Sequence, residues 1–357
     1  MRAIRIVFSA MAAATFVAAS AHAAAPVQGA PEWKSSGPIA FGPDGLLFLA
    51  DTKGAAVFAI DLGDNKATSD AGSIKVDGIN EKVAELLGTT PDKVVINDLA
   101  VNPSSGRTYL SVSRGKGPDA SPALVRVDKN GKLQLISLEN IPFSKADLPN
   151  APTSGNARTE VITDLAFVDG RIFVAGLSNE EFSSRLLALP YPFADPGQGT
   201  SVEIYHGAHG RFETKSPVRT FVPFRSKGES YLLAAYTCTP LVKFPISQMK
   251  AGSHLKGTTI AELGNRNRPL DMITYSKDGK DFLLLANSSR GVMKIPADGV
   301  EKAEGITKPV KDKEGLGYET LSSLKGVMQL DKLDDTHAII LVQTPAGTMN
   351  LETIELP

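Results

Sequence analysis

Three aspartates stand inside short apolar segments of the sequence: Asp98 in INDLAV, Asp164 in ITDLAF and Asp271 in PLDMIT. Carboxylate and amide oxygens are the ligands that Ca²⁺ prefers, so these aspartates and Asn97 form a candidate calcium site. Like charges held close together raise one another's pKa or require a cation. In the alternative, each aspartate bonds the backbone of a neighbouring unit and is a structural pin. The recurrence of the aspartate favours the pin, whereas Asn97 does not recur.

A second group of residues is polar and partly cationic. Turns between the second and third strands of successive repeat units would place several of these side chains on one face of the molecule. That face would suit a small anionic ligand or a peptide, and the alternative is a solvated loop surface. The candidate ligand-binding residues are Arg219, Arg268, Thr237, Asn287 and Arg290.

Histidine and cysteine residues offer a further kind of chemistry. His206 and His209 lie in YHGAHGRFE and could bind zinc or copper, but such a site requires three or four ligands, which favours solvated loop histidines. Cys238 is the only cysteine, which excludes an intrachain disulfide. Its apolar flanks favour a buried, inert thiol over a reactive one. No Gly-x-Ser-x-Gly, Cys-x-x-Cys-His or P-loop pattern is present.

The elements that must position these side chains are short strands in a repeated plan. Each unit has three apolar strands joined by turns, and glycine supplies the positive φ that tight hairpins need. One such unit cannot bury both faces of its sheet, whereas radial stacking of several units can. The sequence therefore predicts an all-β protein, a β-propeller with six blades favoured and seven as the alternative. The units span residues 37–63, 96–137, 162–190, 218–245, 269–296 and 326–356.

Fourth strands are predicted for only some of these units. The segments at 73–78, 202–207 and 258–263 would follow the first, third and fourth units. No chain remains after the sixth unit to supply its fourth strand. We therefore expect the N-terminal segment of the mature chain, around residues 30–36, to close the ring. Residues 79–94 read as a short amphipathic helix that ends at Gly88.

The first residues of the chain resemble a targeting segment. Arg2 and Arg5 precede an apolar run, and the small-residue pattern Ala21-His22-Ala23 follows it. We expect residues 1–23 to be a signal peptide and 24–357 to be a single propeller domain in the periplasm. An uncleaved anchor is the alternative, and no other run is long and apolar enough to span a bilayer. A formal net charge of −1 gives no broad basic field, so no nucleic-acid partner is expected.

Two stretches, INDLAVNPSSGRTYLSVSRG and RPLDMITYSKDGKDFLLLANSSRG, resemble blades of six-bladed bacterial propellers. The similar families are the gluconolactonase-like, NHL-like and YVTN-like ones. In gluconolactonase-like enzymes a divalent ion is held by a Glu at the first blade, by Asn residues and by an Asp, and Asn97 and Asp98 match part of this pattern. At the position where the resemblance requires the Glu, this chain has the sequence SSGP (residues 35–38). Glu32 lies a few residues earlier.

The missing acid favours a binding protein over an enzyme. We expect an exported propeller that docks a periplasmic protein, a peptide or a small ligand on its loop face. The alternative is a divalent-metal-dependent hydrolase of the lactonase type with Ca²⁺ at the channel. A propeller that acts beside a redox protein is a third hypothesis, which no particular residue selects. Fold resemblance alone does not establish an activity.

Overall fold

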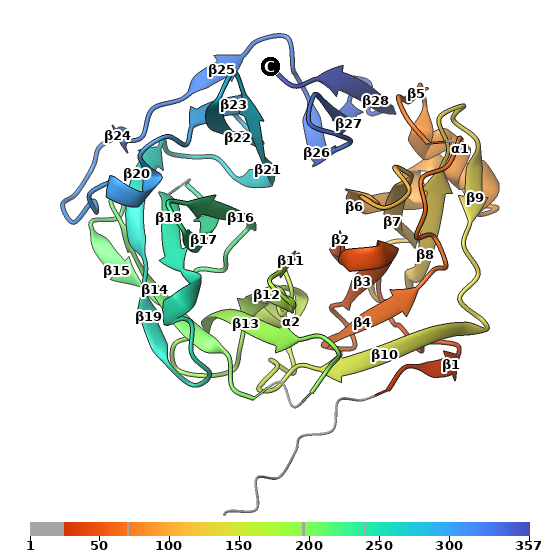
Figure 1. The fold of residues 1–357 in the computed structure, drawn as a ribbon, viewed down its shortest axis with the longest axis horizontal. Coiled ribbons are helices and arrows are strands. Elements are labelled where there is room, and N and C mark those ends of the chain that lie inside the picture. Colours follow the sequence, from red (N-terminus) through yellow and green to blue (C-terminus); the bar gives the residue numbers. More distant parts are fainter. Residues whose placement is uncertain (1–24, 70, 195–196, 239) are drawn as a thin grey trace, which may run out of the picture.

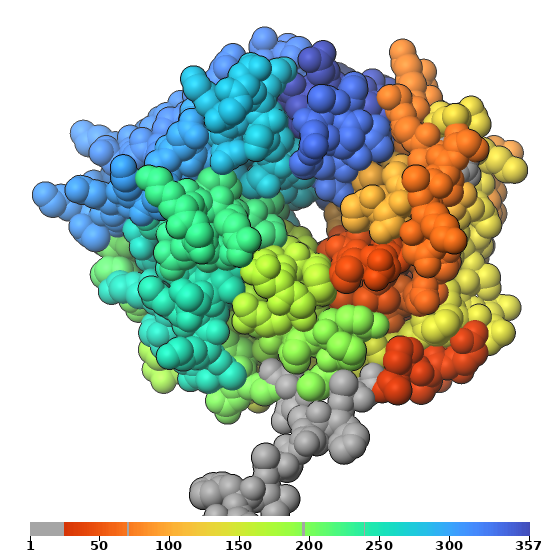
Figure 2. Space-filling view, viewed as in Figure 1, coloured from red at the N-terminus to blue at the C-terminus, as the bar shows by residue number. Residues whose placement is uncertain are grey.

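The structure is a computed structural model that describes residues 25–357 except 70, 195–196 and 239. The predicted signal peptide lies outside the described residues. The described chain forms six sheets, which are arranged as blades around a central opening (Figures 1 and 2) and are antiparallel except for the parallel pair of β14 (Thr200–His206) and β19 (His254–Lys256). The prediction of an all-β propeller with six blades is confirmed. Among the described residues, no helix is long and apolar enough to cross a membrane.

The blades are numbered here by the order in which their innermost strands occur in the sequence. Blade 1 contains β2 (Ile39–Phe41), β3 (Leu46–Asp51), β4 (Ala56–Asp61), β10 (Ile141–Asp147) and β1 (Val27–Gly29). Blade 2 contains β6 (Val94–Val101), β7 (Thr108–Arg114), β8 (Ser121–Val127) and β9 (Leu133–Leu135). Blade 3 contains β11 (Asp164–Val168), β12 (Arg171–Leu177), β13 (Ser184–Pro190), β14 (Thr200–His206) and β15 (Arg211–Glu213), and β19 (His254–Lys256) pairs with β14.

The other three blades follow the same plan. Blade 4 contains β16 (Thr220–Ser226), β17 (Glu229–Ala235), β18 (Pro240–Pro245), β20 (Thr258–Leu263) and β24 (Lys313–Gly315). Blade 5 contains β21 (Pro269–Lys277), β22 (Lys280–Asn287), β23 (Gly291–Pro296) and β25 (Glu319–Leu321). Blade 6 contains β26 (Val327–Lys332), β27 (His337–Gln343), β28 (Met349–Glu355) and β5 (Lys75–Val76).

The chain does not visit the blades in their order around the ring. β2 packs between β6 and β11, and β26 packs beside β6, so blade 1 stands between blades 2 and 3 (Figure 1). After three strands of blade 1 the chain crosses to the edge of blade 6 as β5. It then passes through α1 (Ile79–Leu86) into blade 2 and returns to blade 1 as β10. This crossing connects blades 1, 2 and 6 through one continuous segment.

The predicted closure of the ring by the N-terminal segment is wrong. The outer strand of blade 6 is β5, in which Val76 pairs with Leu351, and β1 instead adds a fifth strand to blade 1. The physical reason is burial, since Ile74 and Val76 fill the core between blades 2 and 6, whereas Val27 is exposed. Segment 73–78 therefore does not complete the first unit, while 202–207 and 258–263 contain the fourth strands of blades 3 and 4, as predicted.

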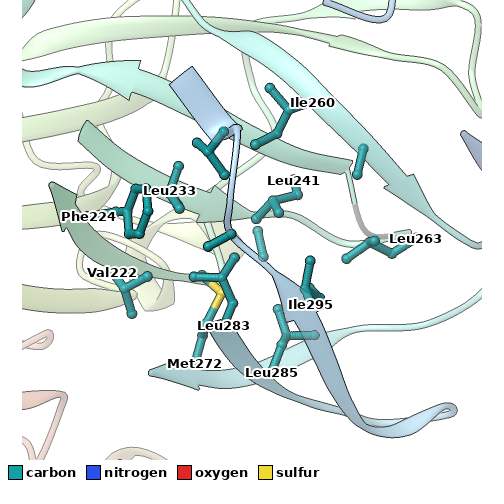
Figure 3. Close-up of a cluster of buried hydrophobic side chains, with 14 of the residues drawn as sticks. Val222, Phe224, Leu233, Leu241, Ile260, Leu263, Met272, Leu283, Leu285 and Ile295 are labelled. Atoms are coloured by element: carbon teal, nitrogen blue, oxygen red, sulfur yellow. The ribbon is translucent and has the colours of Figure 1, made fainter. Parts of the chain in front are cut away.

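The described residues form six hydrophobic core clusters, one between each pair of neighbouring blades. Figure 3 shows the cluster between blades 4 and 5, where Leu233 and Leu241 of one sheet face Leu283 and Leu285 of the next. Both faces of each inner sheet are covered by neighbours, so the middle strands are apolar throughout instead of alternating. Burial of these clusters, rather than any disulfide, holds the ring together.

Few helices interrupt the sheets. The predicted helix is α1, which buries Ile79 and Val83 between blades 2 and 6 and is followed by Gly88 at φ 62°. A second helix, α2 (Gly155–Thr159), lies in the long loop before blade 3. Short 3₁₀ turns occupy Pro43–Gly45, Pro91–Lys93, Gly117–Asp119, Ile246–Gln248 and Val300–Lys302.

Candidate functional site

The innermost strands of all six blades line a central channel with a volume of about 420 Å³. The predicted Asp98, Asp164 and Asp271 all face this channel, and a fourth acid that the sequence analysis missed, Asp331 of β26, joins them. We call these four residues the channel aspartates. Gly326, with which the sixth repeat unit begins, precedes β26 and does not line the channel.

Each channel aspartate makes the same pair of backbone contacts. One carboxylate oxygen accepts a hydrogen bond from the N–H of the following residue, at 2.7 to 2.8 Å. The other oxygen accepts from an N–H on the inner strand of the adjacent blade. These neighbouring donors are Ile39 for Asp98 (2.7 Å), Phe221 for Asp164 (2.7 Å), Leu330 for Asp271 (2.8 Å) and Val101 for Asp331 (2.7 Å). The arrangement is that of a pin between blades.

The enclosure of the channel changes how these acids titrate. Burial raises the pKa of Asp164 to about 7 and that of Asp331 to about 6, although the backbone hydrogen bonds favour their charged forms. Burial raises the pKa values of Asp98 and Asp271 well above the ordinary range, and repulsion among the channel carboxylates adds to the rise. The channel therefore holds fewer negative charges near neutral pH than its four acids would suggest.

The predicted calcium site at Asn97, Asp98, Asp164 and Asp271 stays a prediction. Asn97 is directed away from the acids, and its amide donates a hydrogen bond of 2.9 Å to the Ser113 hydroxyl. Among the described residues, the channel acids do not form a group of three with ligand atoms within 4.8 Å of one another. Both oxygens of each carboxylate also accept backbone N–H groups, which favours the structural pin.

A second cavity, of about 540 Å³, lies where the inner strands begin and so forms one mouth of the channel. Residues 35–38 precede β2, residues 162–163 precede β11, and Arg219 and Arg268 precede β16 and β21. Of the described residues that line this cavity, five carry a charged side chain, four of them cationic, and we call the group the arginine mouth. Its members are Lys53, Arg158, Glu160, Arg219 and Arg268.

Two of the arginines are held by protein groups. Arg219 donates from Nη1 to Glu160 at 2.6 Å and from Nε to the Thr237 hydroxyl at 3.1 Å. Arg158 donates to the Pro152 carbonyl at 3.2 Å and to the Lys53 carbonyl. These bonds fix the loop that carries α2 across the mouth, so that the arginine mouth is preorganised.

Arg268 differs from the other arginines of the mouth. No residue in the described part of the chain accepts a hydrogen bond from its guanidinium, although the Arg268 backbone pairs with Ser288. Burial lowers the pKa of Arg268, and repulsion by Arg219 lowers it further, while Glu160 opposes the change. Arg268 is therefore an exposed, only partly desolvated cation with unused donors, which an anion in the cavity would satisfy.

The structure brings together only part of the predicted ligand-binding group. Arg219 and Arg268 line the mouth, and Thr237 orients Arg219. Asn287 is buried, donates to Asn267 and accepts the N–H groups of Ser289 and Arg290, so it shapes a turn.

Arg290, the remaining member of the predicted group, turns toward Asp312 and the Asn265 carbonyl, outside the mouth. Sequence reasoning missed the three charged residues supplied by other segments: Lys53, Arg158 and Glu160. The only signal for Arg158 and Glu160 was the charged end, NARTE, of the long loop before blade 3, and Lys53 lies outside that loop.

Comparisons with known proteins assign the chain to no family. No protein-family model matches the sequence, and no curated protein does. One similar structure is a putative glucose dehydrogenase from Thermus thermophilus, at 12% identity and TM-score 0.37, covering 92% of this chain and 99% of that one.

Two further structures match over most of the chain. One is a thermostable family-43 glycoside hydrolase, at 11% identity and TM-score 0.40, covering 82% of this chain and 93% of that one. The other is the PQQ-bound aldose sugar dehydrogenase from Streptomyces coelicolor, at 10% identity and TM-score 0.34, covering 94% and 99%. Likenesses at this level of identity do not establish an activity, a substrate or a cofactor.

Proposed function

We propose that this protein is an exported propeller that binds a small anionic ligand, with a carboxylate or phosphate group, in the arginine mouth. The observation that carries the proposal is the unpaired, partly desolvated guanidinium of Arg268 beside Arg219. Two guanidinium groups held in one cavity repel each other unless an anion compensates their charge. The four cations and one acid of the mouth leave an excess of positive charge for such a ligand.

The chemistry of the mouth suits recognition more than bond cleavage. Guanidinium groups bind carboxylate and phosphate oxygens through two parallel hydrogen bonds, which gives orientation as well as affinity. Glu160 is occupied by Arg219, and the channel aspartates are occupied by backbone N–H groups. A lactonase-type hydrolase would need an ion held by carboxylate oxygens that these pins already engage. The signal segment and the export that we infer from it support a role in capturing ligands outside the cytoplasm.

The test is calorimetric titration of the mature protein with citrate, a sugar phosphate and a sugar carboxylate, each at two salt concentrations. We expect binding of at least one anion, weaker at higher salt because the attraction is electrostatic. Arg268→Gln should lower that affinity about 10- to 100-fold, since a hydrogen bond to a charged group is worth about 1.5 to 3 kcal/mol.

The matched control is Arg266→Gln. Arg266 is exposed like Arg268 and lies two residues away in the same loop, but it does not line the cavity. It should bind the anion as the wild type does. Equal losses in both variants would indicate nonspecific attraction to the loop, and no binding of any anion by the wild type would refute the proposal.

A further inference from the structure

His206, His209 and Cys238 come together although the sequence separates them. One ring nitrogen of each histidine and the Cys238 sulfur lie within 4.8 Å of one another. The histidines are at the end of β14 and in the turn before β15, and Cys238 is in the turn between β17 and β18. The cluster therefore spans blades 3 and 4. Cys238 is the third candidate ligand, which the sequence alone did not place near the two histidines.

Glu213 orients both imidazole rings. His206 Nδ1 lies 3.1 Å from one Glu213 oxygen and His209 Nδ1 lies 2.6 Å from the other, with the ring centroids 3.8 Å apart. Because Glu213 contacts Nδ1 of each ring, Nε2 is the ring nitrogen that remains for another partner. Carboxylate–histidine pairs of this kind support metal ligands in proteins.

The second observation is a buried nitrogen without a partner. His206 is buried, and its Nε2 has no hydrogen-bond partner among the described residues. Oε2 of Glu262, whose other oxygen accepts from the Gly207 N–H, is also buried and unpartnered. Such atoms normally find a partner, since burying an unsatisfied polar group is costly. A bound cation would satisfy the imidazole nitrogen.

We propose that His206, His209 and Cys238 bind one transition-metal ion, zinc or copper, through two imidazole nitrogens and one thiolate. This donor set suits both ions, which prefer nitrogen and sulfur to the oxygen ligands of calcium. Zinc bonds of about 2.3 Å to sulfur and about 2.0 Å to nitrogen would place the donor atoms about 3.3 to 3.6 Å apart. The donor atoms lie within 4.8 Å of one another in the structure, so binding requires the side chains to move closer together. Binding releases the Cys238 thiol proton to solvent, and His209, which is exposed, leaves one side of the ion open.

The experiment uses the mature protein, reduced and stripped of metal with a chelator. Titration with Co²⁺ should produce thiolate-to-cobalt charge-transfer absorption that saturates at one ion per chain and disappears when Zn²⁺ is added. Elemental analysis after dialysis against Zn²⁺ or, under reductant, Cu⁺ shows which ion is retained. Cys238→Ser should abolish the absorption band, and Glu213→Gln, which removes only orientation, should weaken binding about 10- to 100-fold.

His209→Gln and His337→Gln form a matched pair. Their side chains are 44% and 40% exposed, but His337 lies in blade 6, away from the cluster. The first substitution should weaken cobalt binding at least about 10-fold, and the second should leave it unchanged. If the wild type shows no absorption band and retains no ion, or if Cys238→Ser binds as the wild type does, the proposal is wrong.

Alkylation of the thiol provides a separate measurement. Saturating Zn²⁺ should slow iodoacetamide modification of Cys238 in the wild type and should have much less effect in His209→Gln. Rapid alkylation that depends on His209 but is unaffected by Zn²⁺ would identify a histidine-activated thiol and overturn the metal site. This inference stands independently of the anion site, because no residue of the arginine mouth is a ligand.

Discussion

The channel aspartates and the arginine mouth lie along the same inner strands, yet they treat ionic groups in opposite ways. Each channel aspartate accepts N–H groups with both carboxylate oxygens, one of them from the adjacent blade. In the mouth, Arg268 makes no hydrogen bond to a described residue through its guanidinium. The channel aspartates use their hydrogen-bonding capacity within the fold, whereas the arginine mouth has donors on Arg268 that no described residue uses.

This difference shows that charged residues in a cavity are not by themselves a binding site. What distinguishes a site is the hydrogen-bonding capacity left after the fold has been satisfied. The channel aspartates attract attention in the sequence because they recur, but recurrence in a repeat protein points to a role that every blade needs. Arg268 does not recur in this way, and a bound anion would accept the hydrogen bonds that its guanidinium can still donate.

The largest expected effect comes from breaking a pin. Asp98→Ala removes the acceptor for the N–H groups of Ile39 and Leu99. The free energy of unfolding should fall by about 2 to 4 kcal/mol, since each unsatisfied buried N–H costs about 1 to 3 kcal/mol. Urea denaturation measures the loss, and anion affinity, measured by calorimetry on the folded protein, should be unchanged.

The control for this substitution is Asp335→Ala. The Asp335 side chain is fully exposed, and its ion pair with Lys332 is a surface contact, so the change should be within about 0.5 kcal/mol. If Asp98→Ala were as stable as Asp335→Ala, the pin interpretation would fail. If it abolished anion binding, the separation between channel and mouth would fail instead.

The next effect concerns pH. The folded-state pKa of Asp164 is raised to about 7 from an ordinary value of 3.8, so between these limits the folded protein binds a proton more tightly than the unfolded chain. The contribution of this group to stability is therefore complete below about pH 4 and is lost as pH rises toward 7. Denaturation at a series of pH values should show stability falling in that window, with a shallower fall in Asp164→Asn.

The opposite outcome would be equally informative. Stability that stays constant or rises between pH 4 and 7, and does not respond to Asp164→Asn, would mean that the channel carboxylates remain ionised. That is the behaviour expected if a bound cation compensates their charge, as the calcium prediction requires. Repeating the series with Ca²⁺ and with EDTA would then show whether a bound cation compensates the charge of the channel carboxylates.

The fold was predictable because its signals are local and repeated. Apolar strands, glycine turns and the count of six units follow from burial and hairpin geometry. The order of the blades was not predictable, because three strands of blade 1 are separated from their fourth by the whole of blade 2. Nothing local distinguishes β5 as the edge of blade 6 rather than blade 1. The choice depends on which core Ile74 and Val76 complete.

The candidate sites, like the fold, were predictable from the sequence only in part. Asp98, Asp164 and Asp271 were found by their shared setting, and Asp331 could have been, since it also interrupts an apolar strand, in VMQLDKL. The proximity of His206, His209 and Cys238 could not be predicted from the sequence. The histidines and the cysteine belong to different blades, and only the ring geometry places them together.

A smaller effect should follow from Glu160→Gln. This substitution removes the only acid of the arginine mouth among its described lining residues and releases Nη1 of Arg219. Anion affinity should rise about fivefold, because roughly 1 kcal/mol of repulsion between ligand and carboxylate is relieved. A fall in affinity would instead show that Glu160 acts mainly to hold Arg219 in position. Calorimetry at low salt gives the sign directly.

The smallest expected effect is that of Asn97→Ala, which separates the two regions most finely because Asn97 adjoins Asp98 but lines the mouth. Its amide donates to Ser113, so the substitution should cost about 0.5 to 1 kcal/mol of stability. Its backbone carbonyl, which accepts from Gln329, is unaffected. Anion affinity should change less than about threefold, since the charged donors remain. A larger loss of affinity would make Asn97 a ligand contact, whereas loss of a Ca²⁺-dependent rise in melting temperature would move it to the channel as a metal ligand.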